Sequence, residues 1–247
     1  MHHVEEDNTN LGLQTTAKEG QELYSSLKGK KYARFPVKTH LIVIDEDLDA
    51  VIQKYAVPEY KEGDIFCITS KVISITKGFY VKESELKVTW LAKFLVRFVK
   101  KTPNDPGFAL PQKIQVAMNE VGILRFIFAM IGGVIMKYIF RKPGYFYILA
   151  GHNIAAIDGF VPHMYPEPLR GYGFLAPKNP DGICNEIEGK FKMPTAMLDG
   201  NNVENIVLGM SDGVSSRFTK EELLQILKGN PQGQSGNTPI LLLREIS

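Results

Sequence analysis

Three short polar segments adjoin apolar, strand-like runs in the second half of the chain. They carry Asp158 and Asp199, each followed by glycine, and Gln234, which a glycine precedes. A carboxylate at a sharp turn after a strand can point from a sheet edge towards a ligand. Two carboxylates and an amide oxygen suit a hard divalent cation such as Mg²⁺ or Mn²⁺. Asp-Gly is also ordinary turn chemistry, so both interpretations stay open.

Residues 63–78 carry the groups that a polyphosphate needs. An apolar, strand-like run is followed by Ser70, Lys71 and Ser74, and Gly78 closes the segment. Hydroxyls, backbone donors and an ammonium within one short turn can bind phosphate oxygens. A solvated turn between two strands accounts for the same residues equally well.

Other side chains allow a functional and a structural interpretation. His152, beside Asn153, can be a ligand or a base, because a free imidazole titrates near neutrality, or it can be a hydrogen-bonded histidine at a strand end. Asp212, in Ser-Asp-Gly, can join the metal site or act as a turn carboxylate. Trp90 lies on the apolar face of a predicted helix, so we expect it in the core.

The composition is typical of a soluble globular protein, with 44% hydrophobic and 23% charged residues among 247. The 29 basic and 27 acidic residues leave no basic tract long enough to follow a phosphate backbone, which argues against nucleic acid. Cys67 and Cys184 are predicted to be buried thiols of a reduced compartment. Residues 1–27 contain no secretory signal, and a cytoplasmic location is expected.

The order of apolar and helical patterns predicts a mixed α/β (α+β) fold. The core begins at 32–37 and 41–44, and further strands are expected at 65–69, 145–150, 195–198, 206–209 and 239–243. Helices are expected at 45–55, 83–101, after the prolines of 103–111 as far as 140, and at 181–190 and 219–228. Thr219 and Glu222 predict a capping box. There is no P-loop, dinucleotide fingerprint or internal repeat.

Residues 123–140 form the most apolar helical segment. Arg125 and Lys137 leave 11 uncharged residues between them, whereas a helix that spans a bilayer needs about 20. Gly132 and Gly133 either let another backbone approach closely or weaken the helix. Because such a helix must be covered, we predict a homodimer contact, with a membrane-surface contact as the alternative.

In their order, these motifs resemble those of the coenzyme F420-0:L-glutamate ligases, the γ-glutamyl ligases of the deazaflavin coenzyme F420. Lys-Val-Ile-Ser at 71–74 is similar to the family's Lys-Val-Val-Ser, and Ala-Ala-Ile-Asp at 155–158 to its Ala-Gly-Val-Asp. The remaining similar segments are Pro-Asp at 180–181, Leu-Asp-Gly at 198–200, Val-Leu-Gly at 207–209 and Gly-Gln at 233–234. The resemblance covers residues 35–245.

The resemblance implies an F420 γ-glutamyl ligase-like fold with mixed sheets and two intimately packed lobes. It places an N-terminal extension at 1–27 and the ligase-like domain at 28–247. The implied activity uses GTP or ATP and a divalent metal, Mg²⁺ or Mn²⁺, to phosphorylate a small-molecule carboxylate, which the amine of glutamate then attacks to form an amide. The implied metal ligands are Asp158, Asp199 and Gln234. The implied nucleotide-binding residues are Ser70, Lys71, Ser74 and Gly78.

The sequence also departs from the family's pattern. The family's Glu-Gly-Arg is Lys77-Gly78-Phe79 here, which removes a carboxylate and a guanidinium from the phosphate segment. The Thr after the second Asp is Gly200, and residues 160–172 have no counterpart. These departures make coenzyme F420 a less suitable acceptor. They also leave a second hypothesis, a non-catalytic nucleotide- or metal-binding regulatory relative, associated with a membrane surface through its apolar helix.

Overall fold

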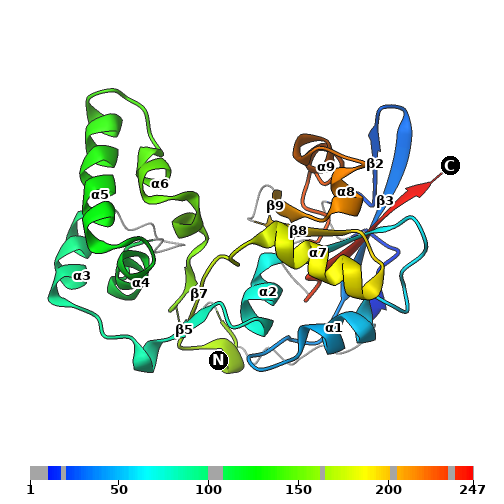
Figure 1. Cartoon of the computed structure of the whole chain (residues 1–247), viewed down its shortest axis with the longest axis horizontal. Helices are drawn as coiled ribbons and strands as arrows, with labels where there is room; N and C mark the ends of the chain where they lie inside the picture. The colour runs from blue at the N-terminus through cyan, green and yellow to red at the C-terminus, as the bar shows by residue number, and fades with distance from the viewer. Residues whose placement is uncertain are drawn as a thin grey trace. The chain divides into compact units, whose positions relative to one another are not determined.

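The computed structural model describes residues 11–17, 21–99, 108–161, 165–200, 205–232 and 237–246. They divide into two compact units (Figure 1). Unit 1 comprises the described residues up to Gly78 and from Pro177 onwards, and unit 2 comprises Phe79–Ala176. Both units combine helices with a sheet, which confirms the predicted mixed α/β class.

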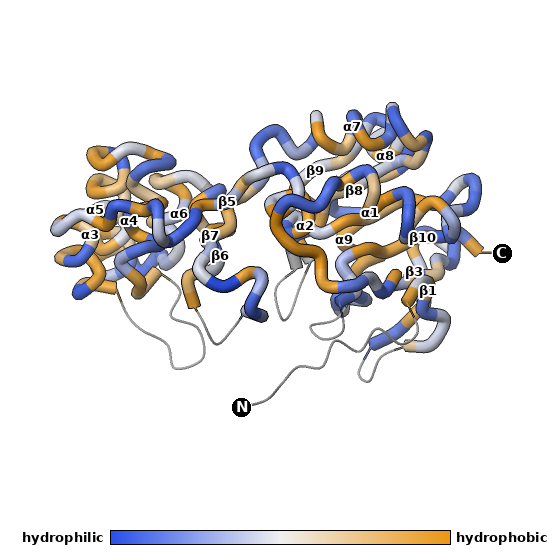
Figure 2. Tube along the Cα trace, turned by 90° about the horizontal axis from the view of Figure 1, so that it is seen from below, coloured by the Kyte–Doolittle hydropathy of each residue, from blue (hydrophilic) through white to orange (hydrophobic). Residues whose placement is uncertain are grey.

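Among the described residues, unit 1 contains a seven-stranded sheet. The sheet order is β1 (Gly12–Leu13), β3 (Lys30–Lys38), β10 (Ile240–Ile246), β4 (Ile65–Thr69), β8 (Thr195–Gly200) and β9 (Asn205–Met210), and β2 (Tyr24–Leu27) pairs with β3 off this path. Strands β4 and β8 are parallel, and the other pairs are antiparallel. Hydrophobic residues run through β10 and its neighbours (Figure 2). Strands β1 and β2 come from the predicted N-terminal extension, so part of it is built into this sheet.

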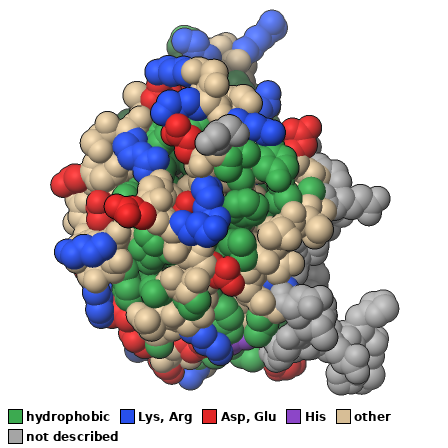
Figure 3. All heavy atoms as spheres, turned by 90° about the vertical axis from the view of Figure 1, so that its right-hand side faces the viewer, with side chains coloured by type: hydrophobic (Ala, Val, Ile, Leu, Met, Phe, Trp, Pro, Cys, Tyr) green, Lys and Arg blue, Asp and Glu red, His purple; other side chains and the backbone are tan. Residues whose placement is uncertain are grey.

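The surface of unit 1 carries charges of both signs. Figure 3, which views the molecule from the side of β2 and β3 in Figure 1, shows basic and acidic side chains interspersed with apolar ones. Exposed ion pairs such as Lys30–Glu245 (2.8 Å) join neighbouring elements of this unit. This face of unit 1 therefore mixes charges of both signs.

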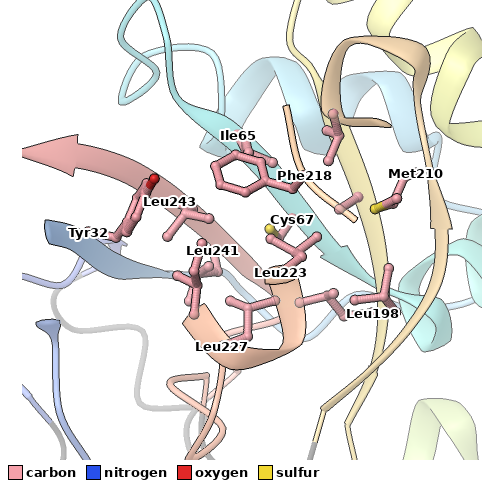
Figure 4. Packing of buried hydrophobic residues seen from close by; sticks show 14 residues of the cluster. Tyr32, Ile65, Cys67, Leu198, Met210, Phe218, Leu223, Leu227, Leu241 and Leu243 are labelled. Atoms are coloured by element: carbon pink, nitrogen blue, oxygen red, sulfur yellow. The ribbon is translucent and has the colours of Figure 1, made fainter. Parts of the chain in front are cut away.

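The core of unit 1 lies between the sheet and its helices. On one face, Cys67, Leu198 and Leu241 pack against α9 (Lys220–Ile226), which follows α8 (Asp212–Ser215) (Figure 4). Phe66 and Leu242, which alternate with these residues along their strands, are buried too, so both faces of the sheet are covered. Strands β4 and β8 contact α2 (Ser70–Thr76), β8 and β9 contact α7 (Pro180–Phe191), and α1 (Leu48–Tyr55) contacts α2.

Helix starts in unit 1 follow local capping chemistry. The Asp47 carboxylate accepts a hydrogen bond from the Ala50 amide at 3.1 Å and caps α1. Thr219 and Glu222 form the predicted capping box at the start of α9. Such caps satisfy amides that have no partner inside the helix, so they position helix ends from the sequence alone.

Unit 2 combines a small antiparallel sheet with a helical cluster. The sheet order is β5 (Tyr80–Lys82), β7 (Tyr172–Phe174) and β6 (Asp158–Gly159). The helices are α3 (Trp90–Leu95), α4 (Pro111–Val121), α5 (Ile123–Tyr138) and α6 (Tyr145–Ala150), with 3₁₀ turns η1 (Glu83–Glu85), η2 (Val96–Phe98), η3 (His152–Ala156) and η5 (Glu167–Leu169). Helix α4 is central, because its residues 113–118 are all buried.

The segment 145–150 is helix α6, so the predicted strand is wrong. Its aromatic and β-branched residues fit a strand by composition, but Phe146 and Leu149, three residues apart, both pack on α5. A Cβ added to Gly132 would lie 2.6 Å from Leu149 Cδ1, and one added to Gly133 would lie 2.9 Å from Phe146 Cβ. The prediction that the glycine pair admits a close neighbour is therefore confirmed.

The predicted amphipathic helix at 83–101 is shorter than expected. Its described part consists of η1, α3 and η2. Thr89 caps α3, which places Trp90 at the first helical position, and the residue that this helix buries is Ala92. Trp90 is 76% exposed, so the prediction that it lies in the core is wrong.

Within the described ranges, no single helix has both the length and the apolar composition to cross a membrane. Helices α4 and α5 have the required length and apolar composition only when they are taken together, as a pair bent by 114°. The bend lies at Gly122, which has φ +84°.

Candidate functional site

Parallel pairing of β4 and β8 brings Ser70 and Asp199 together. The register places Thr69 opposite Leu198, so Ser70, which begins α2, lies beside Asp199, which is still in β8 and pairs with Ile206 of β9. The Ser70 hydroxyl donates a hydrogen bond to Asp199 Oδ1 at 3.1 Å across 129 residues of sequence. In open α/β sheets, ligands bind beside the carboxyl ends of parallel strands. This edge is therefore the part of unit 1 where a ligand is expected.

Strand β10 begins at the same edge. It runs antiparallel to β4, with Ile240 opposite Ile68, and the Thr69 amide donates to the Pro239 carbonyl at 2.9 Å. Gln234 precedes this strand in the sequence and lies outside the described residues. Its role as a metal ligand stays a prediction.

The predicted phosphate segment is helix α2, so the prediction of a short turn is wrong. Val72, Ile73 and Ile75 are buried, and this burial favours a helix over a solvated turn. Ser70 and Lys71 begin the helix beside Asp199, with Ser70 buried and Lys71 half-buried.

The other two predicted nucleotide-binding residues lie further along the chain, with Ser74 one turn after Ser70 in α2 and Gly78 beyond the end of the helix. Ser74 is 2% exposed, and its hydroxyl donates to the Ser70 carbonyl at 2.9 Å. Gly78 follows the last residues of α2 and has φ +77°. A seven-residue helix is about 10 Å long, so Gly78 lies at the far end from Ser70.

Asp158 lies in unit 2, where its partners come from β6, α4 and the segment just before η5. Its Oδ1 accepts a hydrogen bond from the Gly159 amide at 2.7 Å, and its Oδ2 accepts one from the Tyr165 hydroxyl. Lys113 Nζ lies 3.8 Å from Oδ1, with the lysine side chain 5% and the aspartate side chain 41% exposed. A buried ammonium needs a negative partner, so Asp158 is the group that offsets the charge of Lys113.

Lys113 is not among the site residues predicted from the sequence. A usable signal was present, because Lys113 shares a helical face with Val116 and Ala117, three and four residues later, and lysine is rare on a buried face. The glycine after Asp158 has a definite reason as well. Gly159 has φ +98°, and a Cβ there would lie 2.2 Å from the Tyr172 carbonyl oxygen. The close approach of β6 and β7 requires glycine at this position.

The sequence profile of the F420-0:gamma-glutamyl ligase family matches residues 36–204, which is well over half of the chain. The chain belongs to this family. A search of curated proteins found no significant match. Both the Ser70–Asp199 pair and the Lys113–Asp158 pair lie inside the matched range. Membership supports a γ-glutamyl ligase-like function with small-molecule substrates.

In this γ-glutamyl ligase-family chain, Asp212 shares unit 1 with Asp199, whereas His152 and Asn153 belong to unit 2. Asp212 follows β9 at the end where β8 begins, because Ala196 pairs with Met210, so it lies at the opposite end of that strand pair. Asn153 is exposed in η3, and the His152 side chain lies outside the described part of the structure.

Across the described residues of this family member, no group of three or more His, Cys, Asp or Glu side chains is placed to hold a metal ion. The metal site predicted from the sequence has only two carboxylates, with an amide as the third ligand. Asp199 belongs to unit 1 and Asp158 to unit 2. Their convergence stays a prediction. The cysteines are buried and free, as predicted, and burial raises the pKa of the Cys184 thiol to about 12.

Proposed function

We propose that this chain is a nucleotide- and divalent-metal-dependent amide ligase. GTP or ATP transfers its terminal phosphoryl group to a carboxylate of a small-molecule acceptor, which releases the nucleoside diphosphate. The amine of an amino acid such as glutamate attacks the acyl phosphate, phosphate leaves with the electron pair of the C–O bond, and the amine loses a proton. The Ser70–Asp199 pair, at the carboxyl edge of two parallel strands, is the observation that carries this proposal.

The chemistry of Asp199 fits a hard cation. Its described side-chain partner is the Ser70 hydroxyl, a neutral donor rather than a cation. Asp199, Asp158 and Gln234 would hold Mg²⁺ or Mn²⁺, which offsets the charge of crowded phosphate oxygens when bound. Asp158 is already balanced by Lys113, so this ammonium would remain beside the metal ligand and hold the carboxylate in place.

Lys71 is the proposed phosphate-binding cation. It lies one residue after Ser70, in the first turn of α2. An ammonium offers three donors on a flexible stem and binds phosphate as a point charge. Ser70 is already directed to Asp199, so in this proposal it positions the carboxylate while Lys71 contacts the nucleotide.

Nucleotide-dependent thermal stabilisation tests the proposal. With Mg²⁺ or Mn²⁺, GTP or ATP at 100 times its Kd should stabilise the wild type by about 2.7 kcal/mol, because the ligand binds only the folded state. Asp199→Asn should abolish this gain. Asp212→Asn should keep it, because that carboxylate lies at the other end of the β8–β9 pair. No stabilisation of the wild type by either nucleotide with either metal would refute the proposal.

A second substitution separates binding from structure. Lys71→Ala should remove the nucleotide-dependent gain and leave the unliganded melting temperature nearly unchanged, because the side chain is half-buried at a helix start. A large loss of stability without nucleotide would show that Lys71 is structural.

One observation favours a second candidate, a non-catalytic nucleotide- or metal-binding relative. Lys77 stands where the family has glutamate, and its ammonium lies 2.8 Å from Glu186 Oε1 on α7. The segment therefore lacks a carboxylate at the end of α2. Release of phosphate that requires both an amino acid and an acceptor carboxylate would establish the ligase, whereas nucleotide binding without any turnover would favour the regulatory relative.

A further inference from the structure

Helix α5 exposes an apolar stripe. Leu124 is 86%, Phe128 64% and Tyr138 73% exposed, and Ile131 and Ile135 are exposed between them. These residues recur every three or four positions and therefore share one side of the helix. The helix buries Phe126 and Ala129 on its other side. Helix α5 thus buries few of its apolar residues in the core of unit 2 and exposes most of them.

A second apolar row lies on α3 and η2. Trp90, Phe94 and Phe98 follow one another at intervals of four residues, and all three are exposed. The rings of Phe94 and Phe98 are in edge-to-face contact, with centroids 5.3 Å apart. Helices α3 and α5 both lie along the left-hand edge of unit 2 in Figures 1 and 2. We call the exposed residues of α3, η2 and α5 the apolar face.

The apolar face is bordered by basic side chains. Residues 87–150 contain ten Lys or Arg and two Asp or Glu, while the whole chain contains 29 and 27. At about 100° of turn for each helical residue, Arg125 lies about 100° from Leu124 on one side of the α5 stripe, and Lys137 lies about 140° from it on the other side. The remaining exposed basic residues near the face include Lys93, Arg97, Arg141 and Lys142. The mixed charge of unit 1 in Figure 3 makes the contrast clear.

We propose that the apolar face docks on an anionic lipid bilayer. Interfacial helices bury aromatic and aliphatic side chains at the level of the headgroups, while Lys and Arg at their margins bind anionic lipids. Trp90, Tyr138 and the phenylalanines are the side chains that favour this depth. Both parts of the pattern, the apolar stripe and its basic border, are explained by this one partner.

Charge distinguishes this partner from a second copy of the chain. In a two-fold dimer the same patch faces itself, so the basic borders would meet each other and repel. Anionic headgroups would neutralise them instead. The proposal is for binding at the surface, since no described helix is able to span a membrane alone.

The chain carries its own reporter for this docking. Trp90 is its single tryptophan and lies on the apolar face. When the full-length protein is mixed with vesicles of phosphatidylcholine and phosphatidylserine, Trp90 emission should shift to the blue and the protein should float with the vesicles. Pure phosphatidylcholine should bind at least about tenfold less, and 0.5 M salt should weaken binding to the anionic vesicles, because the basic border is screened.

Two variants and one control separate the contributions. Leu124→Ser with Phe128→Ser should abolish the Trp90 shift, and Arg141→Glu with Lys142→Glu should lower affinity for anionic vesicles at least tenfold. Lys54→Glu with Lys228→Glu, which changes the same charge on exposed residues of unit 1, should bind like the wild type. Circular dichroism identifies any variant that has not folded.

Absence of flotation and of a Trp90 shift with anionic vesicles would overturn the proposal. A lipid-free particle of about twice the 27.7 kDa chain mass that the Leu124→Ser, Phe128→Ser variant converts to a monomer would also overturn it, in favour of the homodimer predicted from the sequence. Neither readout depends on nucleotide or turnover, so failure here is distinct from failure of the proposed ligase activity.

Discussion

The buried Asp64 and the half-buried Arg244 form an ion pair that should dominate the local stability of unit 1. Their side chains are 1% and 18% exposed. Arg244 Nε donates to Asp64 Oδ1 at 2.7 Å, and Nη2 donates to Oδ2 at 2.6 Å. The Asp64 carboxylate also accepts the Lys61 amide at 2.9 Å. Hydrogen bonding to Asp64 raises the pKa of Arg244, so the guanidinium stays charged whenever the protein is folded.

Asp64→Asn preserves the size of the side chain and removes its charge. The remaining described acceptor of Arg244 is the Glu59 carbonyl at 3.2 Å, which does not offset a half-buried positive charge. Removing one partner of a buried pair costs about 3–5 kcal/mol. Because the asparagine carbonyl still accepts one hydrogen bond, we expect the lower end, about 3 kcal/mol.

Thiol labelling measures the loss of stability in unit 1, the part of the chain that contains the ion pair. Cys67 and Cys184 both belong to unit 1 and are buried, so they react only after that unit opens. When closing is faster than labelling, about 3 kcal/mol corresponds to roughly 150-fold faster labelling. Glu245→Gln is the matched control, because Glu245 is the next residue on β10 and its ion pair is exposed. The Glu245 side chain is 40% exposed and that of its partner Lys30 is 60% exposed. Its labelling should quicken by less than about fivefold.

Equal labelling rates in Asp64→Asn and Glu245→Gln would refute the assignment of a dominant buried pair. A double variant, Asp64→Leu with Arg244→Met, defines the mechanism further. If the cost comes from an uncompensated charge, the double variant should label more slowly than Asp64→Asn, since apolar pairs often replace buried ion pairs without loss. Labelling of the double variant at least as fast as that of Asp64→Asn would contradict this mechanism.

Three further outcomes follow from local geometry. Burial raises the pKa of Cys184 to about 12, whereas an unfolded thiol ionises near pH ~8.5. The contribution of the neutral, buried thiol to the free energy of unfolding is therefore fully present below about pH 8.5 and is lost as the pH rises towards 12. Between pH 9 and 11, the urea midpoint of Cys184→Ala should fall less steeply than that of the wild type. Gly159→Ala should lower the free energy of unfolding by clearly more than Gly171→Ala in thermal melts, because both have positive φ but only the first places a Cβ against Tyr172. Thr219→Ala should cost about 1 kcal/mol in urea unfolding through loss of the α9 cap, and an unchanged midpoint would mean that the cap contributes nothing.

Local chemistry let the sequence predict much of unit 1. The capping box of Thr219 and Glu222 specifies the start of α9, and the run of β-branched and aromatic residues at 65–69 specifies β4. In unit 2, the pair Gly132 and Gly133 predicted either a close neighbour or a weakened helix, and α6 packs closely on both glycines. Each of these signals acts over a few residues, through backbone hydrogen bonds or the absence of a side chain, and so it can be recognised in one dimension.

Local composition failed where tertiary packing outweighed it. Residues 145–150 have the composition of a strand, yet contact with α5 makes them a helix. The turn expected after β4 is α2, because its apolar residues are buried. Trp90 was expected in the core and is exposed, since Thr89 sets where α3 begins and thereby which side it buries. Helix and strand patterns compete in short apolar runs, and only the neighbouring elements decide between them.

The sequence by itself determined the family and the residue types of the candidate site. Only the tertiary structure decided which of those residues meet. Ser70 and Asp199, 129 residues apart, are joined by the parallel register of β4 and β8, and Lys113 reaches Asp158 because α4 is the central helix of unit 2. Strand order and helix placement depend on burial summed over the whole chain, so they cannot be predicted from a local sequence pattern.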